Sequence, residues 1–136
     1  MELKRGEYTI SCDANRLDLG VVHGFLRTAY WSPNVSEDVV RRSIEHSLCF
    51  GVYHENAQVG FARVITDYAT FAYLADVFIA EQHRGRGLGK WLIETVVSHP
   101  DLQGLRRWIL LTRDAHDLYR KYGFTDLRKP ERFMER

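Results

Sequence analysis

The chain has 136 residues, enough for one compact core and too few for two ordinary domains. Hydrophobic residues make up 45% and charged residues 27%, and the formal net charge of +1 argues against a general nucleic-acid-binding protein. The sequence has neither a signal-peptide pattern nor an apolar stretch that could span a bilayer. We therefore expect one domain over 1–136 that is cytoplasmic and makes no membrane contact.

Cysteine usage argues against two further kinds of site. Cys12 and Cys49 are the only cysteines, and they form no C-x-x-C pair. The histidines are scattered without metal-ligand spacing. The sequence thus predicts neither a disulfide framework nor a metal site.

The first part of the chain predicts one strand followed by two helices. Apolar and polar residues alternate over 7–12, which is typical of a half-buried strand. Apolar residues then recur at helical spacing from 16 to about 30, so we expect a first helix there. Ser36, followed by two acidic residues, predicts the N-cap of a second helix that ends near residue 47.

The rest of the chain alternates between strands, turns and helices. Apolar, β-branched and aromatic runs over 48–53 and 58–65 predict a hairpin, and a turn at 67–70 leads into a strand that holds Asp76. Further on, the pattern predicts a helix from Leu88, a strand over 107–112, a helix over 115–122, a strand from Phe124 and a last short one at 133–134. The order βααβββαβαβ, with this last strand, predicts an α/β fold with a mixed, mostly antiparallel central sheet flanked by helices.

A glycine-rich segment, RGRGLGK at 84–90, lies between the strand that holds Asp76 and the following helix. A helix that begins in a glycine-rich turn presents free backbone N–H groups and the positive end of its dipole, which suits a phosphate-bearing anion. The dinucleotide-binding pattern G-x-G-x-x-G and the P-loop both fail on spacing here, because the required glycines and the Ser or Thr after Lys90 are missing.

The spacing Arg84-x-x-Gly87-x-Gly89 resembles the cofactor loop of the GNAT superfamily of acetyl-CoA-dependent N-acyltransferases. A second segment, LYRKYGF at 118–124, resembles the L-Y-x-x-x-G-F segment that lies further along in that superfamily. The element order agrees over nearly the whole chain, whereas the residue-level likeness covers about 76–124. Thr112 stands where the superfamily often has asparagine, which puts one cofactor contact in doubt, and Glu81 stands where proline is frequent.

The resemblance implies acetyl-CoA as cofactor and CoA as product. It implies that the pantetheine arm lies between two separated strands, the one with Asp76 and the one at 107–112. It also implies a β-bulge near Phe78 and Ile79 that leaves a backbone N–H free to polarise the thioester carbonyl. The residues expected to bind the cofactor are Phe78, Ile79, Arg84, Gly85, Arg86, Gly87, Leu88, Gly89 and Lys90.

Two residues are candidates for proton transfer. Tyr119 stands where the resemblance places the tyrosine that protonates the departing CoA thiolate, and packing on an amphipathic helix is the alternative. Asp76 is an acid in an otherwise apolar strand, where it could take the proton of the amine. A water molecule as base, with Asp76 as a structural residue, is the alternative.

The acceptor pocket is implied at the first two helices and the turn before the strand that holds Asp76, where the candidates are Tyr30, Trp31, Asp67, Tyr68 and Tyr73. Aromatic rings beside an acid suit a cationic amine, but they would equally close a core or a dimer contact. The expected activity is transfer of an acetyl group from acetyl-CoA to a primary amine of a small molecule or peptide, by direct attack in a ternary complex. A non-catalytic acyl-CoA-binding or regulatory module is the alternative, and the sequence leaves a homodimer open.

Overall fold

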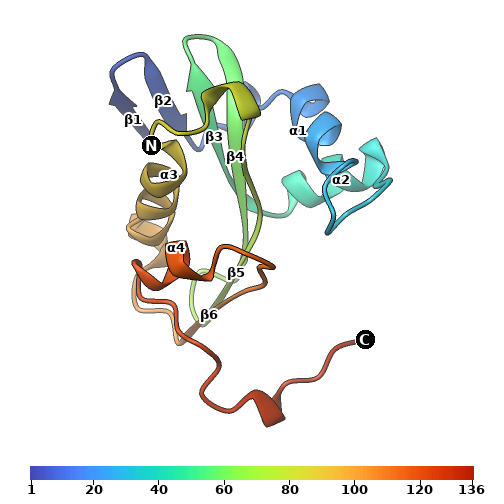
Figure 1. Cartoon of the computed structure of the whole chain (residues 1–136), viewed down its shortest axis with the longest axis vertical. Helices are drawn as coiled ribbons and strands as arrows, with labels where there is room; N and C mark the ends of the chain where they lie inside the picture. The colour runs from blue at the N-terminus through green and yellow to red at the C-terminus, as the bar shows by residue number, and fades with distance from the viewer.

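A six-stranded sheet runs through the centre of the computed structural model, which describes residues 1–136 (Figure 1). Its strands lie side by side in chain order, and all neighbours are antiparallel except the last two, which are parallel. The mixed, mostly antiparallel sheet confirms the predicted fold class. The strands are β1 (Glu2–Arg5), β2 (Tyr8–Ser11), β3 (Leu48–His54), β4 (Ala57–Thr66), β5 (Phe71–Ile79) and β6 (Arg107–Leu110).

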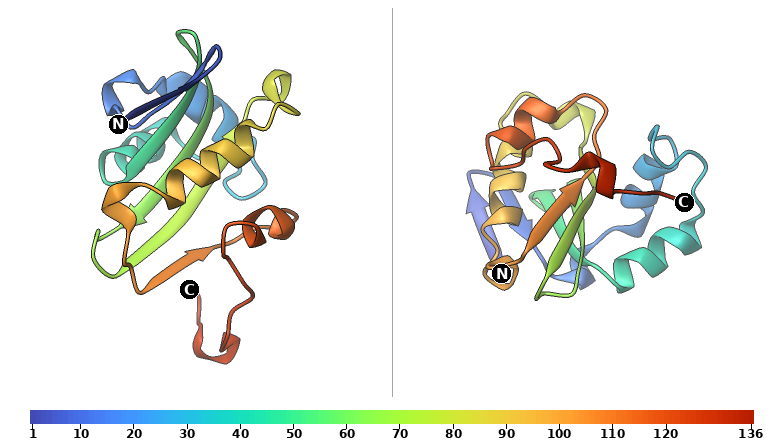
Figure 2. Two further views of the ribbon diagram at one scale, coloured as in Figure 1. Left: turned by 90° about the vertical axis from the view of Figure 1, so that its left-hand side faces the viewer. Right: turned by 90° about the horizontal axis from the view of Figure 1, so that it is seen from below.

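Helices cover both faces of this sheet. On one side lie α1 (Leu19–Leu26) and α2 (Glu37–Glu45), and on the other lie α3 (Leu88–Val97) and the short α4 (His116–Arg120) (Figures 1 and 2). The apolar side chains of α3 pack on the sheet in a core of fifteen buried residues, whereas α1 and α2 enclose a second core of six with strands β3 to β5. No helix of the chain is both long and apolar enough to cross a membrane.

Side-chain caps fix where the first two helices begin. The Ser36 hydroxyl accepts a hydrogen bond from the Val39 N–H at 3.2 Å, which confirms the predicted N-cap of α2. An Asp18 carboxylate oxygen accepts from the Val21 N–H at 3.1 Å and starts α1. The first helix therefore begins three residues later than residue 16, because Arg16 belongs to a separate 3-10 turn.

The parallel strands β5 and β6 are paired over only part of their length. Their register joins Phe71–Leu74 to Arg107–Leu110, and β5 then continues to Ile79 without a partner on that side. The two strands therefore separate beyond Leu74, as the resemblance implied for the strands at the cofactor.

A β-bulge lies where β5 leaves β6. Phe61 of β4 pairs with Phe78, whereas Arg63 pairs with Ala75, so that two residues of β5, Asp76 and Val77, face one residue of β4. Asp76 has a φ of 56°, in the left-handed region. The bulge was predicted near Phe78 and Ile79, and it lies at the two residues directly before them.

Opposite the end of β5, Gly60 of β4 lies where a side chain has no room. A Cβ atom at this position would lie 2.8 Å from the Ile79 Cδ1 atom, 3.0 Å from the Phe78 carbonyl oxygen and 3.0 Å from the Val52 Cβ atom. The two strands approach closely because residue 60 is glycine.

Both ends of the chain differ from the sequence-based expectation. Strand β1 was not predicted, and it pairs with β2 in a hairpin although all four of its residues are exposed. The strands predicted from Phe124 and at 133–134 are wrong, because no strand follows β6. Phe124 instead packs edge-on against Trp108 with a ring distance of 6.0 Å, and the Arg107 guanidinium lies over the Phe133 ring. These aromatic residues contact β6 through side chains rather than through a backbone ladder.

Candidate active site

The glycine-rich segment between β5 and α3 presents a row of unused backbone donors. Gly85 and Gly87 have φ angles of 80° and 79°, which residues with a Cβ rarely adopt. Gly87 is the N-cap of α3, and no side chain caps the helix. None of the N–H groups from Gly85 to Lys90 donates to an acceptor within the protein. These consecutive donors at the positive end of the helix dipole form a site suited to phosphate.

Arg84 holds the start of this segment in place through two hydrogen bonds. Its backbone N–H donates to the Glu81 carbonyl at 3.2 Å, and its Nε donates to the Ile79 carbonyl at 2.9 Å. The first contact closes the 3-10 turn Glu81–His83, and the second fixes the start of the loop to the end of β5. Arg84 was predicted as a source of a free N–H for the cofactor, but that N–H is occupied; Arg86 and Lys90 are exposed and can add positive charge.

A cleft of about 720 Å³ lies where β5 and β6 separate. Strand β5 lines it with Tyr73 to Val77, α4 with Tyr119, and the segment between α1 and α2 with Tyr30 and Trp31. The cleft thus brings together five of the predicted site residues from distant parts of the chain, namely Tyr30, Trp31, Tyr73, Asp76 and Tyr119.

Tyr119 is a largely buried wall residue of this cleft. It is 8% exposed, and its ring packs edge-on against Phe124 at 5.9 Å. Burial, with a smaller contribution from the neighbouring Tyr30, raises the pKa of Tyr119 to about 12. The phenol is therefore protonated at neutral pH and can serve as a proton donor. The Tyr119 hydroxyl has no hydrogen-bond partner within the protein. The Thr112 hydroxyl, by contrast, accepts a hydrogen bond from the Ala115 N–H at 3.1 Å.

Asp76 is held from two sides. One carboxylate oxygen accepts from the Trp31 indole N–H at 3.0 Å, and the other accepts from the Arg63 Nε at 2.8 Å. The Asp76 and Arg63 side chains are only 11% and 16% exposed. An ion pair this well enclosed fixes the Trp31 ring in the wall of the cleft. The base role predicted for Asp76 stays a prediction: each carboxylate oxygen keeps a free lone pair, but taking a proton would leave the enclosed Arg63 without its counter-ion.

Tyr30 connects the two sides of the cleft. Its hydroxyl accepts a hydrogen bond from the Arg113 backbone N–H at 3.0 Å, and the Arg113 guanidinium lies over its ring at 3.9 Å. Trp31 packs edge-on against Tyr30, with ring centroids 5.1 Å apart. The segment after β6 is thereby joined to the segment after α1 across the opening.

Two of the predicted substrate-binding residues do not line the cleft. Asp67 forms the turn between β4 and β5, where its carboxylate accepts from the Thr70 hydroxyl at 2.6 Å and from three backbone N–H groups. These hydrogen bonds, the Thr70 hydroxyl first, lower the pKa of Asp67. Tyr68 is an exposed residue of the same turn with a φ of 61°. Both residues shape the turn.

The two predicted cofactor contacts of β5 lie just outside the cleft. The Phe78 ring is buried and stacks on Phe25 at 4.0 Å, in the core under α1. Ile79 pairs with Gly60 of the neighbouring strand. Their side chains therefore support the sheet, and only their backbone groups are candidates for contact with a ligand.

Sequence reasoning missed Arg63 and Arg113. Arg63 is the only charge in the apolar run of β4, and the predicted turn at 67–70 would have placed it near Asp76 on the next strand, so a signal was present. Arg113 carried no such signal, because its contact with Tyr30 joins residues 83 positions apart.

The combined geometry defines an α/β protein with an anion-binding helix start beside a cleft between two separating parallel strands. The family model described as an acetyltransferase (GNAT) domain matches residues 45–126. The chain belongs to this GNAT family and is an acyltransferase.

Similar proteins agree with this assignment. A protein of Gibberella zeae whose name describes it as an acetyltransferase is 32% identical, over 92% of this chain and 83% of its own. A crystal structure of a GNAT-family protein of Xanthomonas campestris pv. campestris is 52% identical, with a TM-score of 0.93 over 95% of this chain and 92% of its own. A GNAT-family acetyltransferase of Elizabethkingia anophelis, solved with acetyl-CoA bound, shares the fold at 16% identity and a TM-score of 0.67, covering 89% and 78% of the two chains.

Proposed function

We propose that this protein transfers an acetyl group from acetyl-CoA to a primary amine of a small molecule or peptide, by direct attack in a ternary complex. The observation that carries the proposal is the row of free N–H groups from Gly85 to Lys90 beside a cleft that reaches Tyr119. The acetyl-CoA found in the structure of the Elizabethkingia relative supports the choice of cofactor.

The residues present fit this cofactor. The N–H groups from Gly85 to Lys90 would hold its pyrophosphate, and the gap between β5 and β6 would hold its pantetheine arm. When bound, acetyl-CoA would supply an activated acetyl thioester. A backbone N–H group left unpaired by the bulge of β5 would donate to the negative charge that develops on the carbonyl oxygen.

Two proton transfers complete the reaction. The Tyr119 hydroxyl gives its proton to the departing CoA sulfur and takes a proton back from solvent. The attacking amine loses its proton either to Asp76 or to a water molecule in the cleft. A water is favoured because a proton on Asp76 would leave the enclosed Arg63 guanidinium without its counter-ion.

Aromatic rings dominate the acceptor side of the cleft. Tyr30, Trp31 and Tyr73 line it, whereas the charge of Asp76 is paired with Arg63. An amine with an apolar or cationic body can pack on such rings. We therefore assign acceptor recognition to these three rings.

A screen of amines, amino acids, polyamines and peptides with acetyl-CoA, followed by detection of released CoA thiol, tests the proposal. We expect thiol release that depends on one class of amine. In the same samples, CoA should raise the melting temperature, because a ligand that binds only the folded state shifts unfolding. Stabilisation by CoA without acetyl transfer to any amine would favour the non-catalytic acyl-CoA-binding module, and failure of both readouts would contradict the cofactor assignment.

A further inference from the structure

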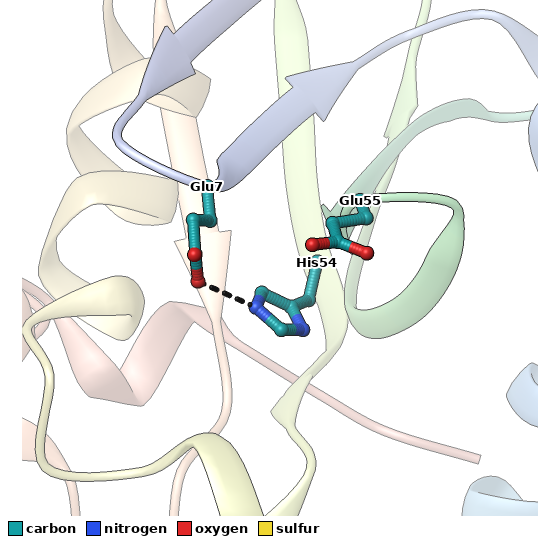
Figure 3. A group of neighbouring side chains, drawn as sticks. All are labelled: Glu7, His54 and Glu55. Atoms are coloured by element: carbon teal, nitrogen blue, oxygen red, sulfur yellow. Dashed lines mark hydrogen bonds and ion pairs between the residues drawn. The ribbon is translucent and has the colours of Figure 1, made fainter.

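Three side chains that could bind a metal ion meet at the end of the sheet where the β1–β2 and β3–β4 turns lie (Figures 1 and 3). They are Glu7, His54 and Glu55, and one ligand atom of each lies within 4.8 Å of the others. The His54 Nε2 atom lies 3.0 Å from a Glu7 carboxylate oxygen. Figure 3 shows Glu7 reaching toward the His54 ring, with the Glu55 carboxylate near that ring on its other side. These residues do not line the cleft of Tyr119.

The backbone holds the three residues together. Tyr8 pairs with His54 across β2 and β3, which places Glu7 beside the end of β3. The Glu55 N–H donates to the Glu7 carbonyl at 3.1 Å and ties the two turns to each other. Glu55 also has a φ of 55°, in the left-handed region that residues with a Cβ rarely adopt. The sequence thus keeps a carboxylate at a turn position where glycine would fit better.

The charge of this group is unbalanced. Neither Glu7 nor Glu55 forms an ion pair with a lysine or arginine, and their only basic neighbour in contact is His54. The Tyr8 ring packs against His54 at 4.9 Å and limits the movement of the imidazole. Two carboxylates and one positioned imidazole therefore form a donor set without a cation of its own.

We propose that Glu7, His54 and Glu55 bind a divalent cation of the zinc class. Imidazole nitrogen with carboxylate oxygen suits Zn²⁺, whereas Mg²⁺ and Ca²⁺ prefer oxygen ligands alone. Bonds of about 2.0–2.1 Å in a tetrahedral site place the ligand atoms roughly 3.4 Å apart. The Glu7 carboxylate oxygen and the His54 Nε2 atom need to move apart by only a few tenths of an ångström. The exposed Glu7 and Glu55 side chains can rotate to bring the Glu55 carboxylate to the same distance. Water takes the fourth position, and His54 binds as the neutral tautomer with its proton on Nδ1, which leaves the Nε2 lone pair for the metal ion.

Such an ion would act as a clamp between the two turns. It would add bonds between the exposed β1–β2 hairpin and the β3–β4 turn, which are joined at this point by one backbone hydrogen bond between Glu55 and Glu7. The His83 ring lies 5.2 Å from the His54 ring and is followed directly by Arg84, so the clamp stands next to the start of the glycine-rich loop.

Calorimetric titration of the untagged, full-length protein with Zn²⁺ tests the site. We expect one equivalent to bind, and we expect His54→Gln and Glu7→Gln each to weaken binding at least tenfold. His46→Gln is the matched control, because His46 is an exposed histidine at the end of α2 with no ionic partner, and it should bind like the wild type. The two thiols are poor competitors, since burial raises the pKa of Cys12 to about 11 and that of Cys49 to about 12.

Amide hydrogen exchange provides a second readout, which reports where in the chain the bound ion acts. Zn²⁺ should slow exchange in residues 2–11 and 54–57 of the wild type and leave the exchange of His54→Gln unchanged. Circular dichroism of the variants without metal should match the wild type, which shows that each variant folds. Wild-type affinity in His54→Gln, or no saturable binding at 100-fold excess of Zn²⁺, would overturn the proposal.

Discussion

The Tyr119 hydroxyl, the proposed proton donor, can be removed without changing the packing of its ring, which tests whether the protein is an acetyltransferase or a module that only binds acyl-CoA. Tyr119→Phe keeps the ring that packs against Phe124 and removes the proton donor. We expect turnover to fall about a hundredfold or more, the usual effect of losing a positioned general acid, with unchanged affinity for CoA. Steady-state kinetics with an amine found by the thiol-release screen, together with CoA titration, measure both quantities.

Tyr122→Phe is the control for this experiment. The Tyr122 hydroxyl donates to the Lys90 carbonyl at 3.1 Å and takes no part in the cleft, so its loss should cost about 1 kcal/mol of stability and little activity. Because the pKa of Tyr119 is raised to about 12, its ionisation should cause no loss of activity below about pH 11. Full activity of Tyr119→Phe would mean that solvent protonates the thiolate.

Asp76→Asn tests whether the carboxylate positions Trp31 or takes the proton of the amine. The substitution leaves Arg63 in an enclosed site without its counter-ion, which should lower the free energy of unfolding by about 3 kcal/mol. Because Asp76 holds the Trp31 ring and is paired with Arg63, we expect a higher KM for the amine and an acidic limb of the pH–rate profile that persists. Loss of that limb would instead identify Asp76 as the base.

The start of α3 can be blocked by a substitution that does not strain the backbone. Gly87→Val would place a β-branched residue at a φ of 79°, so a folding defect would obscure the result. Gly89 lies inside the helix with no positive φ and no protein atom within 4 Å of a Cβ. We expect Gly89→Leu to fold, to crowd the N–H groups from Gly85 to Lys90, and to abolish the rise in melting temperature caused by CoA.

Gly24→Leu is the matched control for this change. Gly24 also lies in a helix, α1, and a Cβ there would meet no protein atom. Both variants gain the helix propensity of leucine over glycine, about 0.8 kcal/mol, so a difference between them reports on the loop alone. An undiminished thermal shift by CoA in Gly89→Leu would remove the helix start from the cofactor site.

Elements with a regular pattern of their own could be predicted from the sequence. The hairpin of β3 and β4 and the N-cap at Ser36 depend on local periodicity and chemistry, so both were predicted. Strand β1 was missed because its residues are exposed on both faces, and only pairing with β2 makes it a strand. The terminal strands were overpredicted because the aromatic residues Phe124 and Phe133 pack on side chains of β6.

The candidate site also has one part that could be predicted from the sequence and one part that could not. The glycine-rich loop carries its anion-binding chemistry in consecutive residues, so the sequence indicated it. The wall of the cleft depends on pairs such as Tyr30 with Arg113 and Trp31 with Asp76, which lie 83 and 45 positions apart. The roles of Asp67 and Tyr68 were misplaced because a turn-forming aspartate and a substrate-binding aspartate look alike in sequence.

The raised pKa values of buried groups predict that the protein as a whole loses stability at alkaline pH. Burial raises the pKa of Cys12 to about 11 and those of Cys49, Tyr53 and Tyr119 to about 12, from 9.0 for cysteine and 10.0 for tyrosine. Above about pH 9 the unfolded chain therefore loses protons that the folded protein keeps, so rising pH favours unfolding. Urea unfolding should give a free energy that is level from pH 7.5 to 8.5 and falls steadily from pH 9 to 11.

Tyr53→Phe isolates one contribution to that fall. The Tyr53 hydroxyl is buried without a hydrogen-bond partner, and the Arg16 guanidinium packs on the ring at 4.3 Å. The variant keeps the ring and removes an unsatisfied polar group, so it should be at least as stable as the wild type at neutral pH. Its unfolding free energy should also fall less steeply above pH 10. An equally steep fall would show that Tyr53 does not ionise on unfolding.

The tight contact around Gly60 bears on how this protein can evolve. Backbone and side-chain atoms crowd position 60 from both neighbouring strands, and even alanine would push β4 away from the bulge. The rings of Tyr30, Trp31 and Tyr73 line an open cleft, so a different side chain there would not meet the same crowding. With the acceptor on those rings, as proposed, descendants of this chain could exchange one acceptor for another by changing the rings, and we expect position 60 to stay glycine throughout.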